Sequence, residues 1–228
     1  MLNLYGDKVK DMAAGHGVDV ATQRADDLDM RAVEFCQTKK KPLVLDLACG
    51  AGGQSARMAA VGAHVVGVDI IDMAAAFSET MAHFERLSTE WGGTEFHQLD
   101  MTAFPSWFLQ KYEGKFDAIV CQRAIHYLPH AQARILLAML KVLLKDDGQL
   151  FISCSGLHSE LGQGYAANAL GQRFDKLSPQ NQDKHAIHHP VCLYSKDEFG
   201  QTLELVGWRI VSLFTSPFGN IKAITSKV

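Results

Sequence analysis

The segment from Pro42 to Asp69 constrains the fold more than any other part of the sequence. It consists of a short apolar run, a turn rich in glycine, a helical stretch and a second apolar run that ends in Asp69. Glycines in such a turn let a ligand approach the backbone, and a carboxylate about twenty residues later can accept hydrogen bonds from ribose hydroxyls. The segment therefore predicts a βαβ unit that binds an adenosine-containing ligand.

The same alternation of short apolar runs and helical patterns continues along the chain. We expect helices over about 21–35, 54–61, 73–91, 131–144 and 196–206, and further strands over 96–99, 116–121, 149–154, 208–214 and 221–226. This pattern predicts an α/β fold with a doubly wound, mostly parallel sheet, closed by a hairpin at the sheet's edge. The 228 residues suffice for a single domain. Residues 155–191 break the rhythm, and we expect an insertion of loops and one helix there.

Charge and cysteine content narrow the function classes. The net charge of -3 argues against a protein that mainly binds nucleic acid, because such proteins usually carry a basic patch. The five cysteines are scattered without a CxxC pair, which predicts neither a disulfide framework nor a cysteine-rich metal site. No signal peptide and no membrane-spanning apolar run is visible, so we expect a cytoplasmic protein. The oligomeric state cannot be predicted.

The first strand ends in an acid, which discriminates between adenosine ligands. Dinucleotide sites usually have Gly-x-Gly-x-x-Gly after an uncharged strand end, whereas here Asp46 ends the strand and Ser55 replaces the third glycine. A carboxylate in the turn would repel a pyrophosphate but tolerate a cation. S-adenosylmethionine, with an ammonium and a sulfonium and no phosphate, fits this charge better than NAD.

These residues resemble a known family. The turn Leu45-Asp46-Leu47-Ala48-Cys49-Gly50-Ala51-Gly52 is similar to the first motif of class I (Rossmann-like) S-adenosylmethionine-dependent methyltransferases, and later segments resemble their small-molecule branch. Residues 145–148 stand where that branch often has a Lys-Pro-Gly-Gly turn. The resemblance implies a seven-stranded, mostly parallel sheet whose last strand is antiparallel. It also implies an enzyme that moves a methyl group from S-adenosylmethionine to a small-molecule acceptor.

The resemblance assigns residues to the cofactor. Asp69 would hold the ribose, Ile70 would pack on the adenine, and Asp100 would bind the adenine amino group. Ala48 replaces the family's usual glycine, a change that adds little volume. The residues expected at the cofactor are Asp46, Ala48, Cys49, Gly50, Gly52, Asp69, Ile70, Asp100, Met101 and Gln122. Taken alone, Asp46 could instead form the turn, and Asp100 could belong to an ordinary loop.

His126 is the candidate catalytic residue. A histidine after the fourth strand would lie at the edge of the sheet where ligands bind, and it could remove a proton from a hydroxyl acceptor. The equally weighted alternative is a loop histidine that bonds backbone. Residues 1–35 and 155–191 are expected to cap the acceptor. Candidate lining residues are Tyr5, Arg24, His158, Tyr165 and Tyr194.

Other chemistries have weaker support. Cys121-Gln122 resembles the nucleophile segment of DNA cytosine methyltransferases, but Val120 replaces its proline, so a buried core cysteine is favoured. The spacing of His185, His188 and His189 matches no familiar metal site, and we expect no metal. A nucleic-acid methyltransferase, an NAD-dependent dehydrogenase and a non-catalytic binding subunit are the competing functions.

Overall fold

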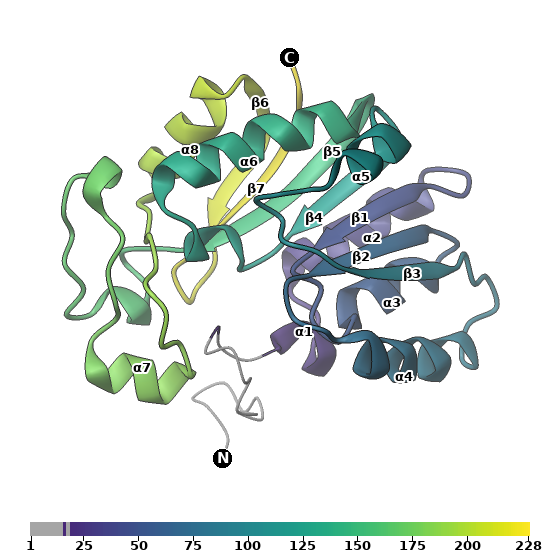
Figure 1. Ribbon diagram of the computed structural model, residues 1–228, viewed down its shortest axis with the longest axis horizontal. Coiled ribbons are helices and arrows are strands. Elements are labelled where there is room, and N and C mark those ends of the chain that lie inside the picture. Colours follow the sequence, from purple (N-terminus) through teal and green to yellow (C-terminus); the bar gives the residue numbers. More distant parts are fainter. Residues whose placement is uncertain (1–15, 17–18) are drawn as a thin grey trace. The chain divides into compact units, whose positions relative to one another are not determined.

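The computed structural model describes residue 16 and residues 19–228, which form two compact units (Figure 1). The β1–β4 unit holds residues 20–121 and 139–151. The β6–β7 unit holds residues 122–138 and 152–228, together with the described residues of the N-terminal segment.

The secondary structure alternates along the chain, as the sequence predicts. The strands are β1 (Leu43–Leu47), β2 (His64–Asp69), β3 (Thr94–Gln98), β4 (Phe116–Cys121), β5 (Leu144–Ser155), β6 (Trp208–Thr215) and β7 (Asn220–Lys227). The α-helices are α1 (Val20–Gln23), α2 (Asp27–Gln37), α3 (Gly53–Ala59), α4 (Ala74–Glu85), α5 (Ser106–Tyr112), α6 (His130–Leu143), α7 (Pro179–His185) and α8 (Lys196–Leu205).

The strands form one seven-stranded sheet in the order β3-β2-β1-β4-β5-β7-β6. Strand β1 pairs in parallel with β2 and β4, and β2 pairs in parallel with β3. The closing strands β6 and β7 pair antiparallel, with β6 at the edge. This topology confirms the predicted α/β class with an antiparallel last strand.

Helices cover both faces of the sheet in the β1–β4 unit. On β3, the Phe96 ring packs 5.3 Å from Phe77 of α4, while the His97 ring lies 5.4 Å from Trp107 of α5. Because neighbouring residues of a strand point to opposite faces, α4 and α5 lie on opposite sides of this strand (Figure 1). Strand β4 is buried along its whole length, as expected for a parallel strand covered on both faces.

In the β6–β7 unit, helix α8 lies along strand β6 (Figure 1). Ser195 begins the helix with a capping box shared with Glu198, and Phe199 and Leu203 are fully buried. The indole of Trp208 donates to the carbonyl of Leu137 at 3.2 Å. The predicted helix 196–206 and the closing hairpin are thus confirmed.

The predicted helix 21–35 is wrong as one element, because the chain forms α1 and α2 instead. Asp26 lies between them and accepts hydrogen bonds from the backbone N–H groups of Leu28 (2.9 Å) and Asp29 (3.0 Å). The Asp29 carboxylate accepts in return from the N–H of Asp26 at 2.8 Å. This capping box starts a new helix at Asp27.

Two other segments between residues 70 and 115 differ from prediction. The helix expected to reach residue 91 ends at Glu85, because the residues after it form hydrogen bonds with the end of α3 instead. Ser88 Oγ donates to the Ala60 carbonyl at 2.9 Å, and the Gly92 N–H donates to the Ala59 carbonyl at 2.9 Å. Helix α5 was not predicted. Its Phe108 and Tyr112 are buried four residues apart, a helical spacing that the sequence does contain.

The segment 145–148, expected to be a turn, lies within the long strand β5. Lys145 Nζ bonds Asp117 Oδ1 at 2.8 Å, and Lys39 Nζ bonds Asp147 Oδ2 at 2.5 Å. These two contacts join residues 145–147 of the extended β5 strand to β4 and to the segment after α2. The insertion 155–191 contains α7 and two short 3₁₀ turns, as well as loops. Within residue 16 and residues 19–228, no helix is long and apolar enough to cross a membrane.

Candidate active site

The turn between β1 and α3 has an unusual backbone. Ala48, Gly50 and Gly52 have φ values of 54°, 55° and 81°. L-residues seldom adopt such values, so two glycines are explained directly. Ala48 stands where the resembling family has glycine, and its methyl group is exposed. The substitution therefore adds no crowding, as the sequence predicts, but it places an L-residue in a backbone conformation that favours glycine.

Asp69 joins this turn to the end of β2. Its Oδ2 accepts the N–H of Gly50 at 2.9 Å, and its Oδ1 accepts the N–H of Ile71 at 3.0 Å. The side chain is only 8% exposed. A carboxylate offers about four lone-pair sites, so each oxygen can accept one further hydrogen bond. Asp69 is thus held in place with acceptor capacity left for a ligand.

Asp46, near the end of β1, contacts the helix that follows the turn. Its Oδ2 accepts the Ser55 hydroxyl of α3 at 2.6 Å, and the carboxylate is buried. This contact fixes the first turn of α3 against the end of β1, which is the structural role that the sequence left open. The Cys49 N–H donates to the Val68 carbonyl at 3.1 Å and ties the turn to β2.

The turn is packed closely against α4. A Cβ at Gly52 would lie 2.6 Å from Met81 Cε and from Phe77 Cδ2. A Cβ at Gly67 in β2 would lie 2.7 Å from the Phe77 ring and 3.0 Å from Cys49 Sγ. Cys49, Phe77 and Met81 belong to one buried cluster. Glycine at these positions lets α4 approach the two strands that carry the acids.

Gly53, which sequence reasoning did not single out, contacts the N-terminal helix. A Cβ on Gly53 would lie 2.3 Å from the carbonyl oxygen of Ala21 in α1. Gln54 Nε2 donates to the Asp29 carbonyl of α2 at 2.8 Å. Part of the predicted N-terminal cap, residues 1–35, therefore packs on the start of α3. The rest of the cap up to residue 15, including Tyr5, lies outside the described residues.

The residues expected around the adenine are accessible. The Ile70 side chain, directly after Asp69, is 56% exposed, which is high for a large apolar residue. Asp100 is exposed, and its Oδ1 accepts both the N–H (2.8 Å) and the hydroxyl (2.7 Å) of Thr102. Its Oδ2 accepts no hydrogen bond from the residues that the structure describes. Met101 is half-buried.

Gln122 and His126 follow β4 and belong to the β6–β7 unit. Gln122 Oε1 accepts the Ser153 hydroxyl at 3.1 Å. Arg123 has a φ of 53°, and its N–H donates to the Ser153 carbonyl at 3.2 Å and hydroxyl at 3.0 Å. Cys121, the last residue of β4, is fully buried, as the core interpretation expects.

The His126 ring is 2% exposed, and its Nδ1 lies 3.4 Å from the N–H nitrogen of Ser155. Burial, together with the positive charges of Arg123 and His16, lowers the pKa of His126 to about 3. The imidazole is therefore neutral at neutral pH. Its contact with backbone matches one of the two roles that the sequence left open, and the base role stays a prediction.

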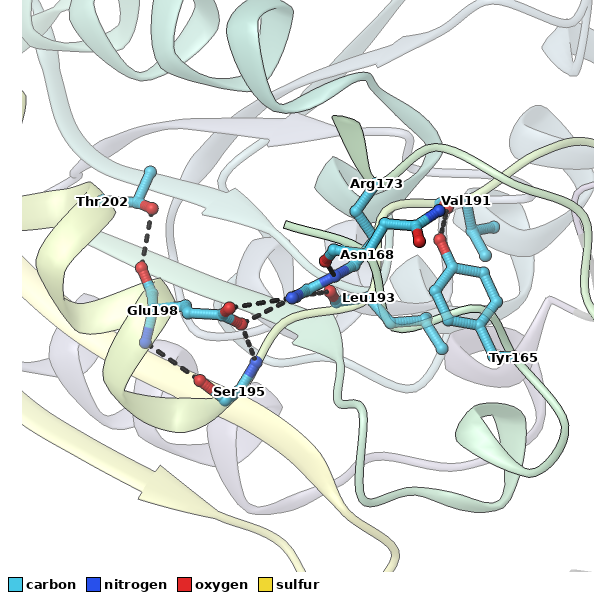
Figure 2. Close-up of polar contacts among 8 residues, drawn as sticks. All are labelled: Tyr165, Asn168, Arg173, Val191, Leu193, Ser195, Glu198 and Thr202. Carbon is cyan, nitrogen blue, oxygen red and sulfur yellow. Dashed lines mark hydrogen bonds and ion pairs between the residues drawn. The ribbon is translucent and has the colours of Figure 1, made fainter. Parts of the chain in front are cut away.

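The insertion is anchored by a buried arginine (Figure 2). Arg173 is 5% exposed, and its guanidinium pairs with both carboxylate oxygens of Glu198, at 2.7 and 2.9 Å. It also donates to the carbonyls of Asn168 (2.8 Å) and Leu193 (2.9 Å). The Arg173 hydrogen bonds hold the pKa of Glu198 at about 2. The insertion thus has a fixed polar connection to the start of α8.

The other predicted lining residues have different environments. Tyr165 is buried in the insertion's own apolar cluster, and its hydroxyl donates to the Val191 carbonyl (Figure 2). Burial raises the pKa of Tyr165 to about 12. Tyr194 is 1% exposed, and Arg24 is half-buried. His158 is exposed and lines an open cavity of about 510 Å³ together with Phe218 of the β6–β7 hairpin.

The loop histidines do not gather into a metal centre. Within residue 16 and residues 19–228, no group of three His, Cys, Asp or Glu side chains is placed to hold a metal ion. His185 Nε2 lies 3.3 Å from Glu160 Oε2. His188 is exposed, and the exposed His189 ring stacks on His16 at 4.4 Å.

Comparison with known proteins decides the family. The methyltransferase domain family matches residues 38–207, which include the glycine turn, both strand-end acids and the loop after β4. The chain belongs to this methyltransferase family. An NAD-dependent dehydrogenase is therefore no longer a competing assignment.

A relative in Glaesserella parasuis serovar 5 (strain SH0165), named ubiquinone biosynthesis O-methyltransferase, is 32% identical over 169 residues, covering 72% of this chain and 67% of that protein. The chain spans about two thirds of the length of the first curated relatives it matches.

Solved structures share the fold at lower identity. A methyltransferase of Burkholderia thailandensis, with bound 1,6-didemethyltoxoflavin and S-adenosylhomocysteine, has a TM-score of 0.63 at 17% identity, covering 92% of this chain and 81% of that one. A [4+2]-cyclase has a TM-score of 0.64 at 15% identity, covering 90% and 81%. The methyltransferase fold alone therefore does not decide the reaction.

Proposed function

We propose that this methyltransferase transfers a methyl group from S-adenosylmethionine to a small molecule and that an oxygen atom is the acceptor. The single observation that carries the cofactor assignment is the geometry of Asp69. Its two oxygens are fixed by the N–H groups of Gly50 and Ile71, and both keep acceptor capacity at the end of β2. A ribose with two adjacent hydroxyls suits such a carboxylate.

The surrounding residues fit the rest of the cofactor. Ile70 offers an exposed apolar surface for an adenine ring, and Asp100 keeps one oxygen for an amino group. Asp46 adds a buried carboxylate next to the turn, of the sign that suits a cation. We assign Ala48, Cys49, Gly50, Gly52, Met101 and Gln122 to the same cofactor on the resemblance to the family. When bound, S-adenosylmethionine supplies a methyl group activated by its sulfonium.

Two arguments support a small oxygen acceptor. The curated relatives are named as O-methyltransferases of ubiquinone biosynthesis, which makes a hydroxyl the first acceptor class to test. The net charge of -3 argues against nucleic acid as the main substrate. We propose that the chain acts as one domain in the cytoplasm, with the N-terminal segment and residues 155–191 covering the acceptor.

The decisive experiment is ligand binding to the purified protein. S-adenosylhomocysteine should raise the melting temperature, because a ligand that binds only the folded state stabilises it by mass action. Asp69→Ala should weaken this binding about a hundredfold, since two hydrogen bonds to a charged acceptor are lost. Glu79→Gln removes one negative charge from the exposed surface of α4 and serves as the matched control.

Three outcomes would count against the proposal. Stabilisation by NAD without stabilisation by S-adenosylhomocysteine would remove the cofactor assignment. Tight, salt-sensitive binding of tRNA or duplex DNA with methyl incorporation would replace the small acceptor by nucleic acid. Cofactor binding without methyl transfer to any phenolic or catechol acceptor would favour a binding subunit.

A further inference from the structure

Both ends of the insertion are hydrogen-bonded to one residue, His126. The His126 carbonyl accepts the N–H of Cys192 at 2.7 Å, and its ring Nδ1 faces the N–H of Ser155 at 3.4 Å. Ser155 ends strand β5, where the insertion begins, and Cys192 follows the last insertion residue, Val191. A single residue after β4 therefore contacts the chain where the insertion leaves the sheet and where it returns.

The base of the insertion is a short hydrogen-bonded ladder. The Leu157 N–H donates to the Tyr194 carbonyl at 2.7 Å, and the Tyr194 N–H donates to that of Ser155 at 3.4 Å. Next to His126, the Tyr127 ring lies 4.4 Å from the imidazole and packs against the apolar cluster of the insertion. The His126 ring thus contacts both Ser155 of the ladder and the Tyr127 ring that packs on the insertion's core.

The bond to Ser155 defines the protonation of the ring. A backbone N–H can only donate, so Nδ1 must accept and carry no proton. The proton of the neutral ring is then on Nε2, which makes that nitrogen a donor. In this tautomer neither nitrogen has a free lone pair with which to take a proton from an acceptor hydroxyl.

We propose that His126 is a positioning residue: its neutral imidazole holds the start of the insertion against the loop after β4. Only the kinetic consequence of this proposal depends on the proposed methyl transfer. Loss of the imidazole should loosen residues 155–194 and raise the KM for the acceptor more than it lowers kcat. The lowered pKa of His126 agrees with a ring that stays neutral from pH 5 upward.

Two substitutions separate positioning from proton transfer. His126→Asn places an amide oxygen close to the position of Nδ1, so it keeps an acceptor for the Ser155 N–H but cannot act as a base near neutrality. His126→Ala removes both functions. His83→Ala, at an exposed histidine of α4, is the matched control.

Hydrogen exchange on the protein alone measures the positioning without any acceptor. In His126→Ala, amides of residues 155–194 should exchange about fivefold faster than in the wild type, the factor that corresponds to one lost hydrogen bond. In His126→Asn they should exchange at nearly the wild-type rate. Unchanged exchange in His126→Ala would overturn the proposal. If His126→Ala does not fold, His126→Asn decides through its exchange and its turnover.

Turnover then gives the second readout. We expect His126→Asn to retain turnover within a fewfold and to show the same rate between pH 6 and 8 as the wild type, whereas the loss of a general base typically lowers kcat about a hundredfold or more. A hundredfold loss of kcat in both variants with unchanged exchange would establish the base role instead. If the wild type transfers no methyl group, the proposed function fails, while the exchange data still decide the positioning.

Discussion

The glycine turn and the insertion are held by opposite means. The turn is held mainly by its backbone conformation. Three of its residues have positive φ, and its glycines let α1 and α4 pack closely against it. In the insertion, side chains hold irregular backbone, chiefly Arg173 against Glu198 and Tyr165 against Val191 (Figure 2). The turn therefore depends on backbone conformation and on the absence of side chains, whereas the insertion depends on specific contacts that side chains make.

The largest effect should come from removing the insertion's arginine. Arg173→Ala leaves the Leu193 carbonyl and the Glu198 carboxylate without their guanidinium partner. Because Arg173 is buried and its removal leaves a partly buried carboxylate and a buried carbonyl unpaired, we expect a loss of about 3 kcal/mol, or roughly 10 °C in melting temperature. Scanning calorimetry measures it. Arg173→Lys keeps the charge but not the two-pronged geometry and should lose about half as much. A loss below about 0.5 kcal/mol would show that apolar packing alone holds the insertion.

The corresponding test of the turn adds a single methyl group. Gly53→Ala would place a Cβ 2.3 Å from the Ala21 carbonyl, so α1 must move. Overpacking of this kind typically destabilises by about 2 kcal/mol. Gly171→Ala in the insertion is the matched control, because a Cβ there meets nothing within 4 Å. Its effect should stay within about 0.5 kcal/mol in denaturant unfolding. Equal effects at the two glycines would contradict the idea that the turn depends on close backbone approach.

Acid should weaken the insertion's anchor in a defined pH range. The Arg173 hydrogen bonds lower the pKa of Glu198 from 4.5 to about 2, so the folded state binds this proton less readily than the unfolded state. Its stabilisation is complete above pH 4.5 and is lost as the pH falls toward 2. The stability difference between wild type and Arg173→Ala should shrink by roughly 1 kcal/mol or less at pH 4. Urea unfolding at pH 7, 5 and 4 measures it. If the stability difference between the two proteins stays constant down to pH 3, ionised Glu198 does not contribute to the anchor.

The same contrast explains how much of the molecule could be predicted from its sequence. The strands, the glycine turn and the position of Asp69 follow from periodicity and from where glycine is needed. Each of these signals lies within a short stretch of the chain, so a single sequence suffices to recognise it. The break before α2 was missed although Asp26 and Asp29 form a local capping box, which shows that a signal can be present and outweighed by the helical pattern around it.

The insertion could be recognised by its composition but not described. Nothing near Arg173 in the sequence predicts that it will pair with Glu198, 25 residues later. Likewise, His126 was singled out for its position after β4, but its contacts with Ser155 and Cys192 depend on the path of the insertion. The identity of a candidate residue could thus be predicted, while its role depends on partners that only the fold brings together.

The smallest effect tests whether local backbone strain acts alike in both regions. Ala48 in the turn and Ala186 at the end of α7 both have a φ of 54°. An L-residue in this conformation costs about 1–2 kcal/mol, whereas glycine avoids this strain but loses roughly 0.5–1 kcal/mol through the entropy of the unfolded chain. Ala48→Gly should therefore raise the free energy of unfolding by about 0.5 kcal/mol. Ala186→Gly should increase the free energy of unfolding less than Ala48→Gly does, because the methyl group of Ala186 is buried.

Ala51→Gly is the control, because Ala51 lies in the same turn as Ala48 but has no positive φ. It should destabilise the protein by about 0.5 kcal/mol. Urea unfolding of the three variants gives the comparison. If Ala48→Gly destabilises as Ala51→Gly does, the exposed methyl group of Ala48 stabilises the turn by more than the strain it causes.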